Sequence, residues 1–256
     1  MSELSVALLQ SFTSWHNPQA NIISIQDQLN QLNSRADIII LPEMWLTGFT
    51  MKAHQFCRDL DLGLNAMIKW STDFKSAIIG SLITKVDDAY YNRAYVISNG
   101  EIIHSYDKKH LFAFSGEDRF YNSGNKKCIF EFNNWKICLN VCYDLRFPVW
   151  SRNIDDYDIL IYCANWPDKR ISAWDTLLKA RAIENQCYVL GVNCTGEDAW
   201  HNTYAGHSSI VNFDGDNLEL LKGRSGILTY KLNLDELQEF RNKFPFLKDR
   251  DTFELQ

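Results

Sequence analysis

Residues 135–148 read WKICLNVCYDLRFP. The first seven form a mostly apolar run that predicts a buried β-strand ending at Val141, and a polar turn follows directly. Cys142 therefore lies where the chain leaves the sheet. A nucleophile in that position presents its side chain outward, and the backbone N–H groups after it can stabilise an oxyanion. A cysteine in an apolar run is more often a structural thiol, but the strand-end position of Cys142 favours a nucleophile.

Short apolar runs bounded by polar turns lie on both sides of this segment. They predict strands at residues 6–9, 38–41, 77–83, 94–97, 159–163 and 188–192. Spaced apolar residues predict helices at residues 20–32, after Asn17-Pro18, and at 173–183. Strands and helices alternate at both ends of the chain, which indicates a layered α/β architecture with covered sheet faces. The pattern does not decide between one sheet and two stacked sheets.

The composition is typical of a globular α/β protein, and we expect residues 1–256 to form one domain. Apolar residues make up 46% of the chain and charged residues 23%, with a formal net charge of −6. This acidic balance argues against a nucleic-acid or anionic-membrane partner.

The seven cysteines form no Cys-x-x-Cys pair and no zinc-like cluster with histidine, so we expect no bound metal. Free thiols in apolar runs are common in reducing compartments. The N-terminus does not read as a secretory leader, and no run approaches the roughly 20 apolar residues that span a bilayer. These features predict a soluble, cytoplasmic protein.

Glu43 follows a second predicted strand, in the stretch IIILPEMW at residues 38–45. Open α/β sheets bind ligands at the carboxyl ends of their strands. Apolar neighbours disfavour the charged form of a carboxylate, which brings a general base toward neutral pH. A solvated loop carboxylate is the ordinary alternative for this residue taken alone.

Lys108 and Lys109 lie in the stretch YDKKHLF at residues 106–112, after a predicted strand. Surface charge is the commoner role of such lysines, but a lysine aimed at a carbonyl group can stabilise an oxyanion. Alternation after the strand would place Tyr106, Lys108 and His110 on one side. Chemistry alone does not separate the two lysines.

Together, in the order Glu, Lys, Cys, these segments resemble the three signature segments of the nitrilase superfamily of carbon–nitrogen hydrolases. The resemblance continues through ANWP at residues 164–167, ARAIENQ at 180–186 and YAGHS at 204–208, so it covers essentially the whole chain. It implies a four-layer α-β-β-α sandwich of the nitrilase type. It also implies a homodimer formed through helices near the nucleophile and residues 180–186, and a reaction that needs no cofactor.

The resemblance further implies roles for single residues. The family lysine lies two residues after the tyrosine, which selects Lys108. Cys142 would attack the carbonyl carbon, and Glu43 would take its proton and pass it to the leaving ammonia. Lys108 and the N–H of Tyr143 would hold the oxyanion.

A second glutamate of the family follows the lysine loop and positions the substrate amide or the water. Glu117, in SGED at residues 115–118, matches that place, although Asp118 is adjacent.

Two stretches are similar to the bacterial omega-amidases, which act on 2-oxoglutaramate and 2-oxosuccinamate. They are residues 147–153, with Val149 where many superfamily members carry an acidic residue, and residues 240–253. The main alternative is another hydrolase of the superfamily, acting on a different small amide, carbamoyl compound or nitrile. A catalytically idle binding protein would be expected to lack at least one of the three central residues. A serine hydrolase is disfavoured because no Gly-x-Ser-x-Gly motif occurs.

An omega-amide substrate carries a carboxylate at its far end, which requires a cationic or N–H-rich partner. Arg170 follows the strand after the nucleophile strand, and our hypothesis is that it binds this carboxylate. The alternative is a solvated arginine that caps the following helix. Asn165 and Trp166 are expected to line the pocket, whereas Arg146 is expected to be structural and to pair with Asp144.

Overall fold

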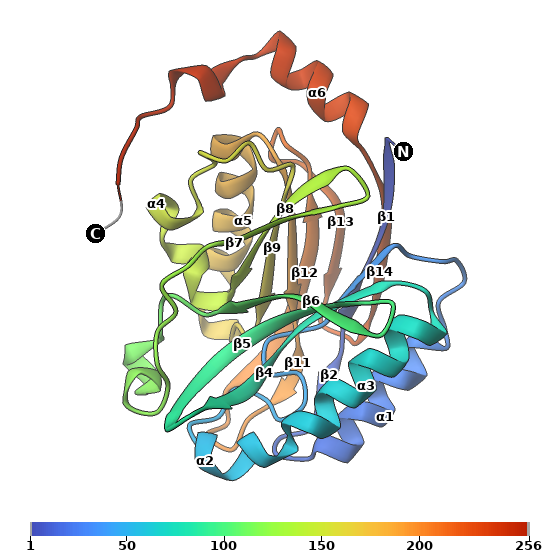
Figure 1. The fold of residues 1–256 in the computed structure, drawn as a ribbon, viewed down its shortest axis with the longest axis vertical. Coiled ribbons are helices and arrows are strands. Elements are labelled where there is room, and N and C mark those ends of the chain that lie inside the picture. Colours follow the sequence, from blue (N-terminus) through green and yellow to red (C-terminus); the bar gives the residue numbers. More distant parts are fainter. Residues whose placement is uncertain (1, 255–256) are drawn as a thin grey trace.

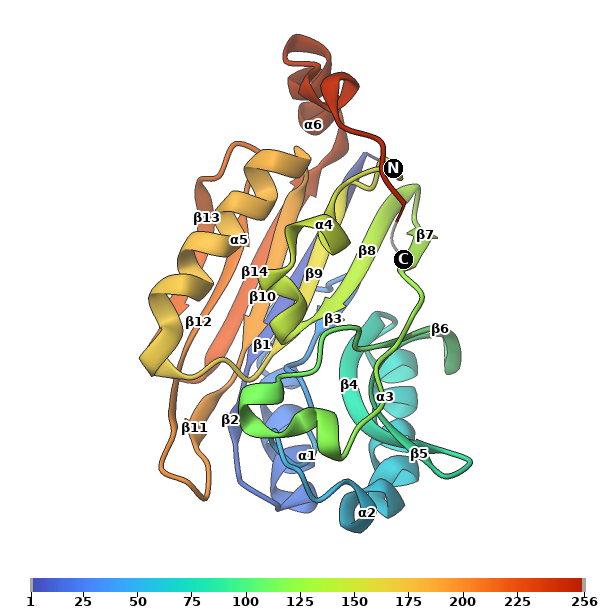
Figure 2. The ribbon, with the colours of Figure 1, turned by 90° about the vertical axis from the view of Figure 1, so that its left-hand side faces the viewer.

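Two β-sheets pack face to face in the structure, a computed structural model that describes residues 2–254. Figures 1 and 2 show the layers: α1 (Pro18–Leu29) and α3 (Leu60–Asp73) cover one sheet, and α5 (Ile171–Asn185) covers the other. The four-layer α-β-β-α sandwich that the resemblance implies is therefore confirmed. The chain has two stacked sheets, a point that the hydrophobic pattern left open.

The first sheet has the strand order β14-β1-β3-β4-β5-β6. Its central strands β1, β3 and β4 are parallel, and β4, β5 and β6 are joined as antiparallel neighbours. Successive side chains point to opposite faces, so Ile38 and Ile40 enter the core between the sheets while Ile39 packs against helix residues. The strands are β1 (Glu3–Gln10), β3 (Ile38–Ile40), β4 (Ala77–Val86), β5 (Ala89–Ser98), β6 (Glu101–Asp107) and β14 (Gly226–Asn233).

The second sheet has the order β2-β11-β12-β10-β9-β8-β7, with β13 paired to β12. Its strands β8, β9 and β10 are parallel, so their carboxyl ends lie at one edge of the sheet. That edge faces the end of β3 across the interface, because the N–H of Asn165 reaches the side chain of Glu43. The strands are β2 (Phe12–Thr13), β7 (Cys128–Phe132), β8 (Trp135–Val141), β9 (Ile159–Ala164), β10 (Tyr188–Asn193), β11 (Thr195–Glu197), β12 (Thr203–Val211) and β13 (Asn217–Lys222).

All the predicted strands and both predicted helices are present, the helices as α1 and α5 with bounds shifted by a few residues. Helix α3 and strands β12, β13 and β14 have no counterpart in the prediction. Helix α3 begins directly after a short 3₁₀ turn and has no side-chain cap. The sequence at its start therefore lacks the capping pattern that predicts the beginning of a helix. Strand β13 is only partly buried and therefore lacks an apolar run. Within residues 2–254, no helix is long and apolar enough to cross a membrane.

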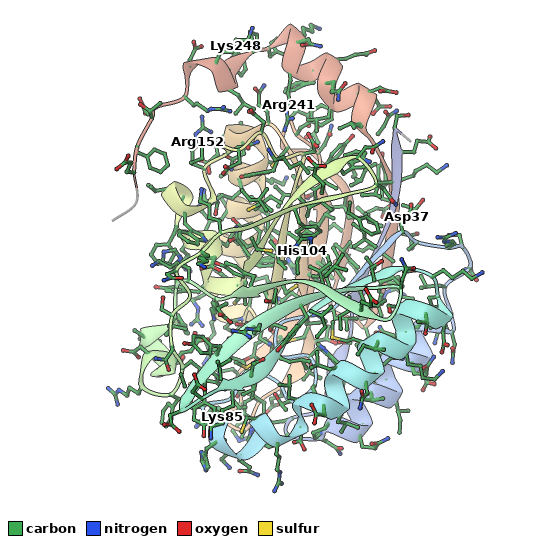
Figure 3. All side chains as sticks on the ribbon, viewed as in Figure 1. Asp37, Lys85, His104, Arg152, Arg241 and Lys248 are labelled. Atoms are coloured by element: carbon green, nitrogen blue, oxygen red, sulfur yellow. The ribbon has the colours of Figure 1, made fainter. Side chains whose placement is uncertain are left out.

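The C-terminal segment, helix α6 (Leu234–Lys243) and the residues after it, crosses one end of the sandwich. Figure 3 shows Arg241 between α6 and the body of the molecule. Its guanidinium donates to Asp158 at 2.9 Å and to the backbone oxygen of Gln186 at 2.9 Å. Further along, Arg250 pairs with Asp156 at 2.6 Å. These ion pairs anchor the segment that resembles the C-terminus of the omega-amidases.

Candidate active site

The carboxyl ends of several strands meet at a cavity of about 400 Å³. Seven of the predicted site residues line this cavity, namely Glu43, Lys108, Cys142, Tyr143, Asn165, Trp166 and Arg170. Their positions in the chain explain the meeting: Lys108 directly follows β6, Cys142 directly follows β8 and Asn165 directly follows β9. The remaining predicted residue, Glu117, is fully buried behind Lys108.

Lys108 and two carboxylates form a buried ion cluster. The Nζ of Lys108 donates to Glu43 Oε1 at 2.8 Å and to Glu117 Oε2 at 2.9 Å, and all three side chains are at most 1% exposed. Burial lowers the pKa of Lys108, but the negative charges of Glu117 and Glu43 outweigh it and hold the pKa above its ordinary value. The lysine therefore stays charged. Lys109 points elsewhere, with its Nζ 5.5 Å from the centre of the Trp150 ring.

Glu117 is held in place by the loop around it. The N–H of Phe112 donates to Glu117 Oε2 at 2.6 Å. Burial raises the pKa of Glu117, Lys108 lowers it and Glu43 raises it again, with a net upward shift. The adjacent Asp118 is exposed, so the geometry favours Glu117 as the second glutamate of the site.

Cys142 begins a 3₁₀ turn, Cys142–Arg146, with a backbone φ of 45°. This left-handed conformation is unfavourable for a residue with a Cβ, and such strain is often stored at functional positions. Burial, and next the charge of Glu43, raise the pKa of the Cys142 thiol well above its ordinary value, although Lys108 opposes them. The thiol is therefore protonated at rest and needs a base to become a nucleophile.

Asp144 fixes the turn that carries Cys142. Its buried carboxylate accepts hydrogen bonds from the N–H of Val141 at 3.0 Å and from the hydroxyl of Tyr106 at 2.8 Å. It also accepts from the N–H of His110 at 2.9 Å. The same side chain therefore joins the nucleophile turn to the loop that carries the lysine.

Asn165 connects the two sheets at the site. Its backbone N–H donates to Glu43 Oε2 at 2.9 Å, and its side-chain amide donates to the backbone oxygen of Glu43. Its backbone oxygen lies 3.9 Å from the Cys142 sulfur. The carboxylate of Glu43 is therefore held from both of its oxygens, by Lys108 on one side and Asn165 on the other.

Two arginines line the cavity. The guanidinium of Arg146 lies 4.9 Å from the centre of the Trp166 ring, and that of Arg170 lies 5.0 Å from the Phe112 ring. Within residues 2–254, neither forms an ion pair. The expected pairing of Arg146 with Asp144 is wrong, because the oxygens of Asp144 bind other donors. Arg170 makes no side-chain cap to α5, so both cations are available to an anionic ligand.

Sequence reasoning missed other residues of the site. Asn92 of β5 is fully buried and donates to Glu43 Oε1 at 2.7 Å. Tyr204 and Asp198 line the cavity, and the Tyr204 hydroxyl donates to Asp198 at 3.1 Å. The partly exposed Trp200 lies at the cavity rim. Asn92 gave no clear signal because it lies beside Arg93 and before the apolar run at residues 94–97, and the other three lie in a loop and hairpin without any pattern.

The comparisons with known proteins show the family to which the chain belongs. The model of the carbon–nitrogen hydrolase family matches residues 5–242. The omega-amidase YafV of Yersinia enterocolitica is 40% identical and covers 100% of both chains. The 2-oxoglutaramate amidase of Bacillus subtilis is 32% identical and covers 96% of both.

A solved structure is similar over the same length. XC1258 from Xanthomonas campestris, described as a CN-hydrolase superfamily protein with an arsenic adduct in the active site, has a TM-score of 0.96 and 34% identity over 100% of both chains. The family match and the two full-length likenesses confirm the resemblance seen in the signature segments. The chain therefore belongs to the carbon–nitrogen hydrolase family.

Proposed function

We propose that this protein is an omega-amidase, which hydrolyses the terminal amide of a small 2-oxo dicarboxylic acid monoamide and releases ammonia. The substrates that fit are 2-oxoglutaramate and 2-oxosuccinamate. The observation that carries the proposal is one cavity with a thiol, a carboxylate and a charged lysine at its floor and two arginines without acidic partners on its wall. The names of the full-length relatives, an omega-amidase and a 2-oxoglutaramate amidase, support this activity.

Glu43 acts as the general base. It takes the thiol proton of Cys142 as the sulfur attacks the amide carbon, which the raised pKa of that thiol makes necessary. When the C–N bond breaks, protonated Glu43 gives its proton to the leaving nitrogen, and ammonia and a thioester result. Glu43 then takes a proton from water as the water oxygen attacks the thioester carbon. When the C–S bond breaks, protonated Glu43 returns the proton to the sulfur, which restores the thiol and releases the carboxylic acid.

Lys108 stabilises the oxyanion together with the N–H of Tyr143. The lysine is charged and pre-oriented by its two carboxylate contacts, so little reorganisation is needed when negative charge develops on the substrate oxygen. Tyr143 is the residue directly after Cys142, where the N–H of a strand-to-turn elbow can face the same oxygen. Glu117 acts through Lys108, since it is buried behind it.

The far end of the substrate is bound by the arginines. Arg170, which follows β9, takes the carboxylate, and Arg146 adds a second cation to the lining of the same cavity. The indole N–H of Trp166 donates to the backbone oxygen of Arg170 at 2.8 Å. Asn165 and Trp166 therefore shape the wall between the reacting sulfur and the arginines.

The first experiment is ammonia release from 2-oxoglutaramate by the purified protein, with Cys142→Ala as the control. Release that the substitution abolishes supports both the nucleophile and the substrate. Release only from another amide, a carbamoyl compound or a nitrile keeps the mechanism and rejects the omega-amidase assignment. No release from any of them contradicts the proposal.

The second experiment tests whether the two arginines bind the carboxylate at the far end of the substrate. Arg170→Ala and Arg146→Ala should each raise KM for 2-oxoglutaramate about tenfold or more, because a charge-assisted hydrogen bond is lost. The KM for a neutral amide of similar length should change little. Equal increases of KM for both substrates would show that the arginines do not bind the carboxylate.

We also propose that the protein works as one catalytic domain in the cytoplasm, as a homodimer, without nucleic-acid or membrane partners. Val149 of α4 (Pro148–Ser151) and Ile183 of α5 are 51% and 55% exposed. The N–H of Asn153, two residues after α4, donates to the side chain of Asn185 at the end of α5 at 2.9 Å, so the end of α4 lies close to the end of α5 that carries Ile183. A second copy would cover the two apolar side chains, and light scattering of the protein in solution tests the dimer.

A further inference from the structure

Asn92 contacts both carboxylates of the buried ion cluster and the backbone of the lysine that they share. Its Nδ2 donates to Glu43 Oε1 at 2.7 Å and to Glu117 Oε1 at 3.3 Å. Its backbone oxygen accepts the N–H of Lys108 at 3.0 Å. One neutral residue of β5 thus bridges the general base, the second glutamate and the backbone of the lysine.

The orientation of the Asn92 amide follows from these contacts. Its Oδ1 is buried and, within the described part of the chain, has no hydrogen-bond partner. A flipped amide would place that oxygen against two carboxylates, so the donor must face them. Buried polar atoms without partners are rare in proteins. An amide that leaves one end unpaired while its other end serves two carboxylates is better explained by the carboxylates than by packing.

The geometry points to Asn92 as a positioning residue that keeps the Glu43–Glu117 pair ionised and oriented toward Lys108. This inference rests on the proposed function, since it gives Glu43 the role of base. Two carboxylates share one lysine here, so the cluster carries one negative charge more than the lysine neutralises. A neutral donor placed between them stabilises the charged form without adding a charge.

The other titratable groups that face this pair come from several elements. They are Lys108 after β6, Cys142 after β8, Tyr121 after the 3₁₀ turn Glu117–Arg119, Cys163 of β9 and Cys194 after β10. Lys108 is the cation among them. Without Asn92, the donors that remain for the two carboxylates are the lysine and the backbone N–H groups of Asn165 and Phe112.

Two variants test the inference. Asn92→Leu removes the donor while keeping the branched shape and the number of heavy atoms, and Asn92→Asp is isosteric but adds a carboxylate. Both keep the backbone bond to Lys108. The matched control is Asn21→Leu in α1, which removes a similarly buried amide that bonds to the backbone of Ser14 and Leu46 and to neither carboxylate.

The readout is the pH profile of kcat/KM for the substrate that the wild-type protein hydrolyses, together with the pH profile of Cys142 alkylation by iodoacetamide. Alkylation followed by peptide mass needs no knowledge of the substrate. In both Asn92 variants, the acid limb of each profile should move to higher pH by roughly half a unit or more, because the charged carboxylates have lost a donor. kcat should fall about tenfold or more, with KM nearly unchanged, since Asn92 does not line the cavity.

A fall in activity with unshifted acid limbs would overturn the inference, because simple loss of packing predicts that result. A KM increase without a fall in kcat would overturn it as well. Failure of both variants to fold would assign Asn92 a structural role instead. If the wild-type protein hydrolyses no amide but its alkylation profile shifts in the variants, the proposed function fails while the positioning role stands.

Discussion

Replacing Lys108 with methionine removes the cation that two buried carboxylates share. At an effective dielectric constant of about 20, a contact near 3 Å has a Coulomb energy of about 5 to 6 kcal/mol, and Lys108 makes one to Glu43 and one to Glu117. Much of this offsets the lost hydration of the three groups. The net cost of breaking a buried pair from one side is about 3 to 5 kcal/mol. We expect Lys108→Met to lose about that much free energy of unfolding at pH 8.

The loss of unfolding free energy in Lys108→Met should become smaller as the pH falls. The direction of this pH dependence follows from the pKa shifts. The pKa of Lys108 lies above its ordinary value, so its stabilising effect is complete below about pH 10. In the variant, burial raises the pKa of Glu117 without a lysine to oppose it. A group whose pKa is raised in the folded state stabilises that state at low pH and loses this effect as the pH rises. The variant should therefore approach the wild type between pH 8 and pH 5.

Urea unfolding followed by tryptophan fluorescence at pH 5, 6.5 and 8 measures this dependence, with ammonia release recorded in parallel. Lys109→Met is the matched control, since Lys109 contacts neither carboxylate, and it should stay within about 0.5 kcal/mol of the wild type. A Lys108→Met protein that is as stable as the wild type at pH 8, or equally destabilised at pH 5, would refute the reasoning.

Two other predictions concern the base and the nucleophile. Glu43→Gln should reduce kcat by about 10²- to 10⁴-fold and slow the alkylation of Cys142; alkylation at the wild-type rate would mean that another group deprotonates the thiol. Cys142→Gly should be at least as stable as Cys142→Ala in thermal unfolding, although glycine normally costs about 0.5 to 1 kcal/mol relative to alanine in regular structure. The reason is the φ of 45° at this position, and a clearly less stable glycine variant would show that the left-handed turn is not strained.

Several parts of the site could be predicted from the sequence because local pattern determines them. The apolar runs before Glu43 and Cys142 form β3 and β8, and Lys108 directly follows β6, so each of the three residues lies where a strand ends. Order and spacing in the signature segments then gave the family. Chemistry could not separate Lys108 from Lys109, whereas the family spacing selects Lys108. In the structure, the Nζ of Lys108 contacts Glu43 and Glu117, and that of Lys109 lies over the Trp150 ring.

The sequence by itself determined the strands that lead into the site, the two helices α1 and α5, the family and the residues at the strand ends. Only the tertiary structure decided what surrounds them: the amide of Asn92 between two carboxylates, Arg146 on the cavity wall instead of beside Asp144, and the burial of Glu117 behind the lysine. The physical reason is the separation along the chain of the residues that interact. Hydrophobic periodicity acts between neighbours along the chain, whereas the pairing of buried charges depends on which strands and loops meet after the two sheets have packed.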